Sequence, residues 1–154
     1  MRVLRADSGD AGRWNEYVDH HPAACVYHEF EWGPLFKQVY GFQSFYLMAL
    51  RGHEVAGVLP SVMLSSPAFG RILVSMPYFG HGGMLVDDEL VARAITREAA
   101  TIARDRGAKY IELRDLDEHD VGWYERREKA NMVLSLPETA EDLFRFKHLK
   151  KKAR

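Results

Sequence analysis

A glycine-rich loop is the part of the sequence best suited to line a ligand site. Residues 77–83 read PYFGHGG, so three glycines and one proline fall within seven residues. Such a segment has unusual backbone freedom, and the amides of Gly82 and Gly83 could hold a phosphate or a carboxylate. Histidine exchanges a proton near neutral pH, so His81 could assist proton transfer. A simple turn between two strands, with His81 on the surface, explains the same residues.

A second candidate group follows a predicted strand over residues 109–114. Arg114 ends this strand, and Asp115 and Asp117 come directly after it. A carboxylate at the end of a strand could accept the proton of an attacking amine. The same residues could instead form ion pairs at the mouth of a loop. We retain Asp115 and Asp117 as candidate proton acceptors.

Other chemistries find no support in the residue spacing. Cys25 is the single cysteine, so it has no disulfide partner and no second thiolate for a metal, and we expect it in the core. His53 and His119 lack the spacing of metal ligands, and we predict no metal site. The sequence contains no Walker loop, dinucleotide fingerprint, Gly-x-Ser-x-Gly elbow or Cys/His nucleophile pattern.

The composition is that of one ordinary globular domain. The chain has 154 residues, of which 47% are hydrophobic and 28% charged. The apolar runs are far shorter than the roughly 20 residues of a membrane-spanning helix. The N-terminus is charged and lacks the apolar core of a secretory signal, so we expect a cytoplasmic protein.

Charge is distributed unevenly along the chain. Lys and Arg number 21 and Asp and Glu 22, but residues 143–154 contain six of the basic and none of the acidic side chains. Such a run could contact the phosphates of a nucleic acid. It is also typical of a solvated helix face, or of a helix that enters another domain.

The hydrophobic pattern predicts the elements that must position the candidate residues. Helices are expected over residues 10–20, 32–40 and 89–106, with caps at Asp10 and at Asp87 or Asp88. A last helix should open at Thr139. Strands are expected over 43–50, 55–64, 71–76, 84–86, 109–114 and 132–136, with a turn at 51–54 and a bulge or edge position at Pro60. The first two helices should precede every strand of an α+β domain built on one central sheet.

This order of elements, and the segments themselves, resemble a known family. Residues 14–50, 54–66, 72–87 and 107–117 resemble in order the N-terminal half of FemAB-related proteins, the Fem-type peptidoglycan-bridge aminoacyltransferases. The resemblance implies a GNAT-like fold, that is, a mixed and largely antiparallel central sheet flanked by helices. Residues 1–137 would form a first GNAT-like unit. Residues 138–154 would form a helix that leads into a second unit, absent from this chain.

The resemblance also implies a function and site residues. The family transfers an acyl or aminoacyl group to an amine, in its better-known members from charged tRNA onto a cell-wall precursor. The family's aromatic-plus-lysine pattern falls on Trp32 and Lys37, where Lys37 would meet substrate phosphate, with a spacing one residue longer than the tighter form. The family's GGP stretch falls on Gly82 and Gly83, with Met84 in place of proline.

The substrate-binding set predicted from loop and resemblance together is Lys37, Tyr78, His81, Gly82, Gly83 and Arg114. Alone, the unit should be inactive. It would carry no cofactor, and aminoacyl-tRNA or acyl-CoA would be the donor of the full protein. Its partners would be a second GNAT-like domain or another copy, a small-molecule or cell-wall-precursor acceptor, and tRNA.

Two other functions remain open. The first is a single-domain, acetyl-CoA-dependent GNAT N-acetyltransferase. Such an enzyme needs a glycine-rich loop directly before the long helix to hold pyrophosphate, whereas Met84–Glu89 ends in three acids that would repel it. The second is a non-catalytic interaction module whose basic C-terminal helix docks a partner or RNA.

Overall fold

The computed structural model describes residues 1–68, 70–124, 137–139 and 141–142. Residues 1–123 form one compact unit, to which all the elements below belong, and residues 124–154 form another. The strand expected over 132–136 and the basic run at 143–154 lie outside the described residues. Within the described part of 137–142, the Asp142 amide donates to the Thr139 hydroxyl over 3.2 Å, which is the predicted cap contact.

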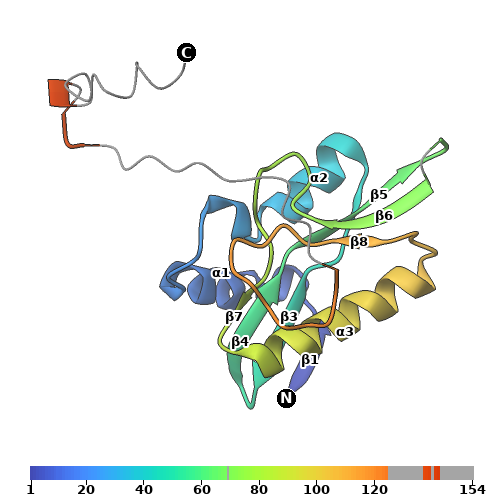
Figure 1. The fold of residues 1–154 in the computed structure, drawn as a ribbon, viewed down its shortest axis with the longest axis horizontal. Coiled ribbons are helices and arrows are strands. Elements are labelled where there is room, and N and C mark those ends of the chain that lie inside the picture. Colours follow the sequence, from blue (N-terminus) through green and yellow to red (C-terminus); the bar gives the residue numbers. More distant parts are fainter. Residues whose placement is uncertain (69, 125–136, 140, 143–154) are drawn as a thin grey trace. The chain divides into compact units, whose positions relative to one another are not determined.

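The described residues of the compact unit form three α-helices, two short 3-10 turns and eight strands (Figure 1). The helices are α1 (Ala11–His20), α2 (Trp32–Tyr40) and α3 (Glu89–Asp105). The strands are β1 (Arg2–Arg5), β2 (Gln43–Ser44), β3 (Leu47–Arg51), β4 (Glu54–Leu59), β5 (Ser61–Ser66), β6 (Gly70–Ser75), β7 (Leu85–Val86) and β8 (Ile111–Glu112). The α+β order with a mixed, largely antiparallel sheet flanked by helices is confirmed.

The sheet is divided into two four-stranded parts. One has the order β1-β3-β4-β7 and the other β2-β5-β6-β8, in which β8 runs parallel to β6. The parts meet at a corner where the Phe45 amide donates to the Ser61 carbonyl and the Ser61 hydroxyl to the Phe45 carbonyl. Pro60 separates β4 from β5 at this corner. The irregularity predicted at Pro60 is therefore the point where the strand passes from one part to the other.

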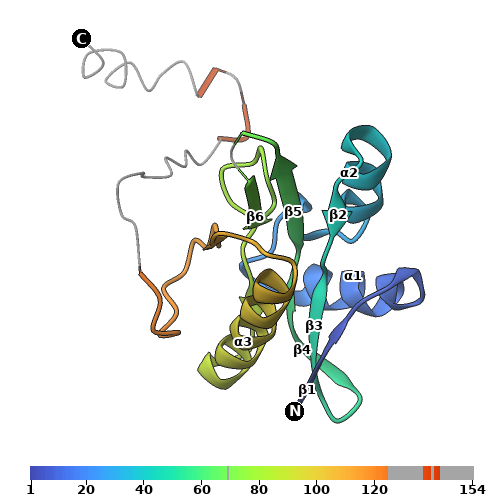
Figure 2. The same cartoon turned by 90° about the vertical axis from the view of Figure 1, so that its right-hand side faces the viewer.

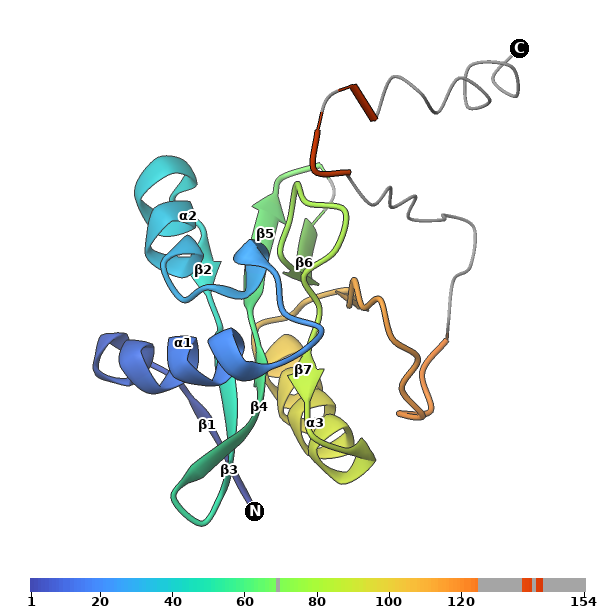
Figure 3. The same cartoon turned by 90° about the vertical axis from the view of Figure 1, so that its left-hand side faces the viewer.

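Both faces of the first part are covered by helices (Figures 2 and 3). On one face, Leu47 and Ala49 pack with Val91 and Ile95 of α3. On the other, Met48 and its neighbours pack with Trp14 and Val18 of α1. The alternation along β3 that predicted two buried faces is confirmed. A third cluster joins α2 to the second part of the sheet through Phe36, Val62 and Met76.

Local signals placed most helix ends correctly. Gly41 and Gly107 have φ of +69° and +66° and follow α2 and α3, because glycine accepts the left-handed conformation that ends a helix. The Asp88 carboxylate accepts hydrogen bonds from the amides of Leu90 and Val91, as an N-cap does. Asp10 stands at the N-cap position of α1, as predicted, but its side chain makes no cap hydrogen bond there and instead accepts from the Asp7 amide. Asp7 caps the short turn before α1.

A strand missed by the sequence pattern precedes both N-terminal helices. β1 pairs antiparallel with β3, from Arg2 opposite Leu50 to Arg5 opposite Leu47. Its four residues alternate poorly, with Arg2 and Arg5 exposed and two half-buried apolar residues between them. The expectation that helices come before every strand is wrong, because pairing with β3 rather than local pattern makes this segment a strand.

No helix in the described ranges is both long and apolar enough to cross a membrane.

Candidate functional site

The candidate residues of two separate segments meet in one pocket. The connection from β6 to β7 returns past the end of β8, where the Gly82 amide donates to the Arg114 carbonyl over 3.2 Å. The Met84 amide donates to Oδ1 of Asp115 over 2.6 Å. The pocket between them is lined by Ala23, His28, His81–Leu85 and Arg114–Asp117. Five predicted site residues besides Asp115 therefore lie here: His81, Gly82, Gly83, Arg114 and Asp117.

Asp115 is the less exposed of the two carboxylates that line the pocket. Burial raises its pKa, and neighbouring Asp117 acts in the same direction. The hydrogen bond from the Met84 amide and the charge of His119 act in the opposite direction but are outweighed. A carboxylate with a raised pKa binds a proton more firmly than an ordinary one. Asp115 is therefore better suited than exposed Asp117 to accept a proton from a ligand.

The two glycines allow this close approach. A β-carbon on Gly83 would overlap the Asp115 carboxylate and lie 2.8 Å from the Asp115 Cα. Gly82 has φ of +133°, and a β-carbon there would lie 2.8 Å from the Met76 side chain. The need for glycine is thus geometric at both positions. The Gly82 amide is also already engaged by Arg114, so it does not face a ligand as an open donor.

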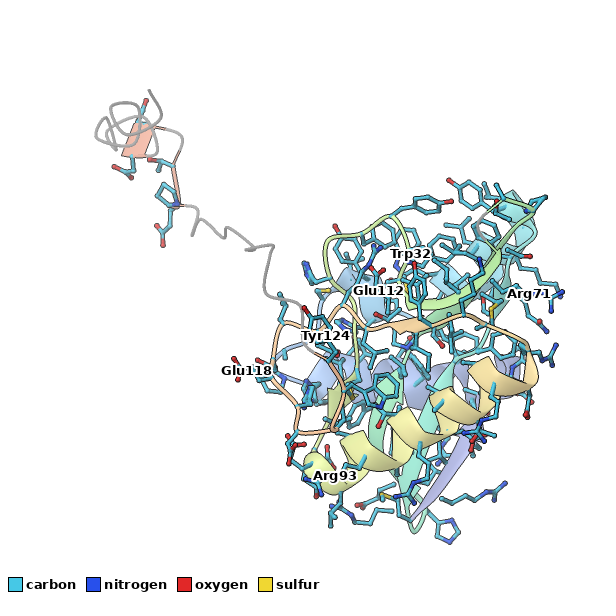
Figure 4. The ribbon with its side chains drawn as sticks, turned by 45° about the vertical axis from the view of Figure 1, so that its right-hand side comes forward. Trp32, Arg71, Arg93, Glu112, Glu118 and Tyr124 are labelled. Carbon is cyan, nitrogen blue, oxygen red and sulfur yellow. The ribbon has the colours of Figure 1, made fainter. Side chains whose placement is uncertain are left out.

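Arg114 holds the loop rather than projecting from it. Its Nη1 donates to the Phe79 carbonyl over 2.7 Å and its Nε to Oε1 of Glu112 over 2.8 Å. Its own amide donates to the Ser75 hydroxyl. Figure 4 shows Glu112 on β8, immediately before the segment that lines the pocket. Since the guanidinium already has partners, we assign Arg114 to positioning the loop.

The loop itself contains two unusual backbone conformations. Met76 and Tyr78 have φ of +43° and +72°, values that residues with a β-carbon rarely adopt. The Tyr78 ring is 65% exposed and lies near Tyr40 and Phe36 of α2. Strain of this kind is often concentrated near functional segments.

Lys37 and Tyr78 do not line the pocket that holds the other candidates. Lys37 is exposed on α2, and Tyr78 packs against the same helix. Their predicted contact with substrate phosphate would therefore belong to a different part of the surface from the Asp115 pocket.

His28 is a pocket residue that the sequence did not single out. It is only 3% exposed, and its carbonyl accepts a hydrogen bond from the Trp14 indole over 2.7 Å. Burial lowers the pKa of His28 to about 4, so its imidazole is neutral at pH 7. No local sequence pattern predicted this burial, and the contact with Trp14 joins residues 14 positions apart.

The N-terminus of α3 is occupied by the chain's own carboxylates. Asp88 accepts from two helix amides and from Nη2 of Arg51 over 2.7 Å, contacts that lower the pKa of its carboxyl group. Asp87 accepts from the Tyr17 hydroxyl over 2.9 Å. Glu89 lies 3.6 Å from His119. A phosphate at this helix end would have to displace a capping carboxylate.

In the described ranges, no three His, Cys, Asp or Glu side chains are grouped so that they could hold a metal ion.

Known structures identify the fold. FemX matches with 19% identity and a TM-score of 0.57, over 70% of this chain and 25% of FemX. An aminoglycoside 6′-N-acetyltransferase from Acinetobacter haemolyticus matches with 16% identity and a TM-score of 0.58, over 89% of this chain and 100% of the enzyme. A GNAT family acetyltransferase from Staphylococcus aureus matches with 10% identity and a TM-score of 0.55, over 86% of this chain and 98% of that one. The chain has the GNAT fold.

The GNAT-like fold was predicted from the order of elements and from the resemblance to FemAB-related proteins, and these structures confirm it. The chain spans about a quarter of the length of FemX. No family model matches the sequence. No curated protein matches it either.

Proposed function

We propose that this chain is the acceptor-binding unit of a FemAB-like N-acyl or aminoacyltransferase. The observation that carries the proposal is the contrast between two ends of the same fold. The α3 N-terminus, where an ordinary GNAT enzyme would hold pyrophosphate, is closed by Asp88. The pocket beside β8 presents a carboxylate of raised pKa. This arrangement favours binding an amine over binding acyl-CoA.

The chemistry assigned to the pocket is deprotonation of the acceptor. Asp115 accepts a proton from the ammonium group, which frees the nitrogen lone pair. The nitrogen then forms a bond to the acyl carbonyl carbon, and the bond from that carbon to the oxygen or sulfur of the donor breaks. The leaving group carries away that bond's electron pair and takes up the second proton of the nitrogen, so that a neutral amide and a neutral alcohol or thiol result. Gly83 and the Met84 amide keep the Asp115 carboxylate in place.

The donor would be held outside this unit. A second GNAT-like unit, or another copy of the chain, would close the cleft and carry aminoacyl-tRNA or acyl-CoA. In this proposal residues 1–137 are the first unit and 138–154 lead toward the second. Lys37, with Tyr78 beside α2, would contact a phosphate of the acceptor, a cell-envelope precursor, away from the amine.

Binding measurements on the chain test the proposal. Nuclear magnetic resonance titration with a small primary amine should shift the amide signals of Gly83, Met84 and Asp115. Asp115→Asn should weaken this binding about tenfold or more, so that the same shifts require more amine. Acetyl-CoA and coenzyme A should leave the α3 N-terminal amides unchanged. Unchanged amine affinity in Asp115→Asn would contradict the assigned role of Asp115.

A single-domain, acetyl-CoA-dependent N-acetyltransferase is the second candidate. It is favoured by the coverage of complete acetyltransferase chains, such as the aminoglycoside enzyme matched over 100% of its length. Saturable stabilisation of the chain by acetyl-CoA, together with acetyl transfer to an amine without any added protein, would support it over the first proposal.

A further inference from the structure

Three arginine side chains from distant segments gather at the C-terminal end of α3. Arg5 ends β1, Arg71 lies on β6, and Arg106 directly follows α3. The guanidinium carbons of Arg5 and Arg106 lie 4.3 Å and 5.3 Å from the centre of the Phe45 ring. Nη1 of Arg71 donates to the Arg106 carbonyl over 3.0 Å (Figure 4). The fold therefore brings three positive charges to one place.

Each of these guanidiniums is held by a neutral oxygen. Nη2 of Arg5 donates to the Ser44 carbonyl over 2.6 Å, and Nη1 of Arg106 donates to Oε1 of Gln43 over 3.2 Å. The Phe45 ring, only 1% exposed, adds a cation–π contact to both side chains. Because these contacts already restrict the side chains, a ligand would have to order them less on binding.

These charges are not balanced by the carboxylates of the described ranges. Arg5, Arg71 and Arg106 take part in none of the ion pairs found there, whereas Arg51 and Arg93 each pair with an aspartate, over 2.7 Å and 2.6 Å. Burial lowers the pKa of the Arg5 guanidinium, and the charge of Arg106 acts in the same direction. An anion bound between these side chains would relieve their repulsion.

Capping of α3 explains only part of this arrangement. The C-terminal end of a helix attracts positive charge, and Arg71 meets that need at the Arg106 carbonyl. Arg5 donates instead to the Ser44 carbonyl of β2, and it lies against the same ring as Arg106. The meeting of Arg5 with Arg106 therefore needs another explanation.

The remaining donors favour a tetrahedral oxyanion. A guanidinium has five N–H donors, and the described contacts of each of these three side chains use one. Guanidiniums from three elements can meet several oxygens of a phosphate, whereas a carboxylate presents only two oxygens. None of the three arginines lines the pocket beside Asp115.

We propose that Arg5, Arg71 and Arg106 form a binding site for a phosphate group, at the opposite end of α3 from Asp88. The site is separate from the pocket assigned to the amine, and it goes beyond the proposed function. A free phosphate ion and the phosphate of a small ester offer the same oxygens to these donors. The experiment therefore includes both.

Titration of the full chain at about 0.15 M sodium chloride, where distant charges are screened, tests the site. Inorganic phosphate should shift the Phe45 and Gly107 amide signals and the Nε–H signals of Arg5 and Arg106, and the shifts should saturate. Acetate should bind about tenfold more weakly. Equal binding of glycerol 3-phosphate would identify an ester as a ligand of the site, and binding of inorganic phosphate alone would restrict the site to the free ion.

Variants test whether the guanidiniums themselves bind the phosphate. Arg106→Gln should weaken phosphate binding about tenfold, as expected when hydrogen bonds to a charged group are lost. Arg106→Lys keeps the charge but not the planar fork, so it should recover only part of the affinity. The matched control is Arg2→Gln, which removes a positive charge from the exposed start of β1. It should change the affinity by roughly twofold at most.

Thermal unfolding shows whether each variant folds. Arg5→Gln provides the same test as Arg106→Gln from a different element and should also weaken phosphate binding about tenfold. If neither variant folds, the shifts of the unaltered chain decide.

The outcomes keep this site apart from the proposed function. Shifts at Lys37 with none at Phe45 or Gly107 overturn the site and leave the role of Lys37 intact. Equal binding of acetate and phosphate overturns it, as does an equal loss of affinity in Arg2→Gln and Arg106→Gln. Phosphate binding as described, in a chain that binds no amine, supports the site and contradicts only the proposed function.

Discussion

The α3 N-terminus and the pocket beside β8 are both places where this fold offers polar groups, but only one leaves them open. At α3, the Asp88 carboxylate satisfies two helix amides and pairs with Arg51. In the pocket, the described contacts of the Asp115 carboxylate are limited to one hydrogen bond, from the Met84 amide to Oδ1. A helix end that caps itself is a structural feature, whereas a carboxylate that lines a pocket can also contact a ligand. Substitutions in the pocket and at the α3 N-terminus test whether only the pocket binds a ligand.

The largest effect is expected from Gly83→Ala. The new β-carbon would overlap the Asp115 carboxylate, so either the loop or the end of β8 must move. We expect the free energy of unfolding to fall by about 3 kcal/mol and amine binding to be lost. Urea denaturation measures the free energy of unfolding, and titration measures amine binding.

Gly12→Ala is the control for that change. Gly12 lies in α1 with no atom within 4 Å of the added β-carbon. Alanine there should stabilise the chain by about 0.5–1 kcal/mol. If Gly83→Ala is as stable as the unaltered chain, the contact between Gly83 and Asp115 does not constrain the pocket.

Asp115→Asn should separate binding from stability. Its raised folded-state pKa means that stability falls as pH rises from the unfolded-chain pKa, about 3.9, through the folded-state value. Asparagine still accepts from the Met84 amide, so the variant should be at least as stable at pH 7 and lack this decline. Amine affinity should fall about tenfold or more.

Unfolding curves between pH 3 and 8, paired with amine titrations, check this prediction. The matched control is Asp117→Asn, since Asp117 is exposed and does not contact the Met84 amide. Asp117→Asn should change both the pH-dependent stability and the amine affinity less than Asp115→Asn does. A strong loss of stability in Asp115→Asn would mean that the carboxylate serves the fold rather than a ligand.

Asp88→Ala should have a smaller effect, confined to stability. It removes the cap of α3 and the contact with Arg51, and should lower the melting temperature by a few degrees. Because the folded-state pKa of Asp88 is lowered, its contribution is present above about pH 3.9 and lost as pH falls through the folded-state value.

Asp88→Ser retains a capping oxygen and should recover most of the melting temperature. Amine binding should be unchanged in both Asp88 variants. A loss of amine affinity in either variant would mean that the α3 N-terminus also contributes to amine binding.

The smallest effect concerns the exposed face of α2. If Lys37 meets phosphate, inorganic pyrophosphate should shift its amide signal, and Lys37→Ala should weaken that binding about threefold, as for one exposed charge contact. Stability and amine binding should not change. The control is Gln38→Ala, a neutral exposed neighbour on the same helix. Equal pyrophosphate binding in both variants would remove Lys37 from the substrate-binding set.

Features governed by a few neighbouring residues could be predicted from the sequence. The bounds of α2, the Asp88 cap and the glycines after α2 and α3 depend on backbone conformations and capping contacts within one or two turns. The two buried faces of β3 followed from strict alternation. The order of these elements, together with the resemblance of the segments to FemAB-related proteins, predicted the GNAT-like fold, although β1 was missed.

Sequence analysis also identified many of the pocket residues, but not how they contact one another. Gly83 and Asp115 were both candidates, but their contact joins residues 32 positions apart, and only the return of the chain past β8 creates it. Arg114 was named as a substrate ligand, yet the structure turns its guanidinium toward Glu112 and Phe79. Side-chain direction depends on which partners the fold brings within reach.

Tertiary structure alone decided that β1 is a strand and that His28 is buried and neutral. β1 exists because β3 pairs with it, and its own residues carry no clear alternation. Burial lowers the pKa of His28 to about 4, so its imidazole is neutral at pH 7, and its backbone carbonyl is held by the Trp14 indole of α1. Strand pairing and burial both require contacts between distant segments of the chain, and these contacts form only in the tertiary structure.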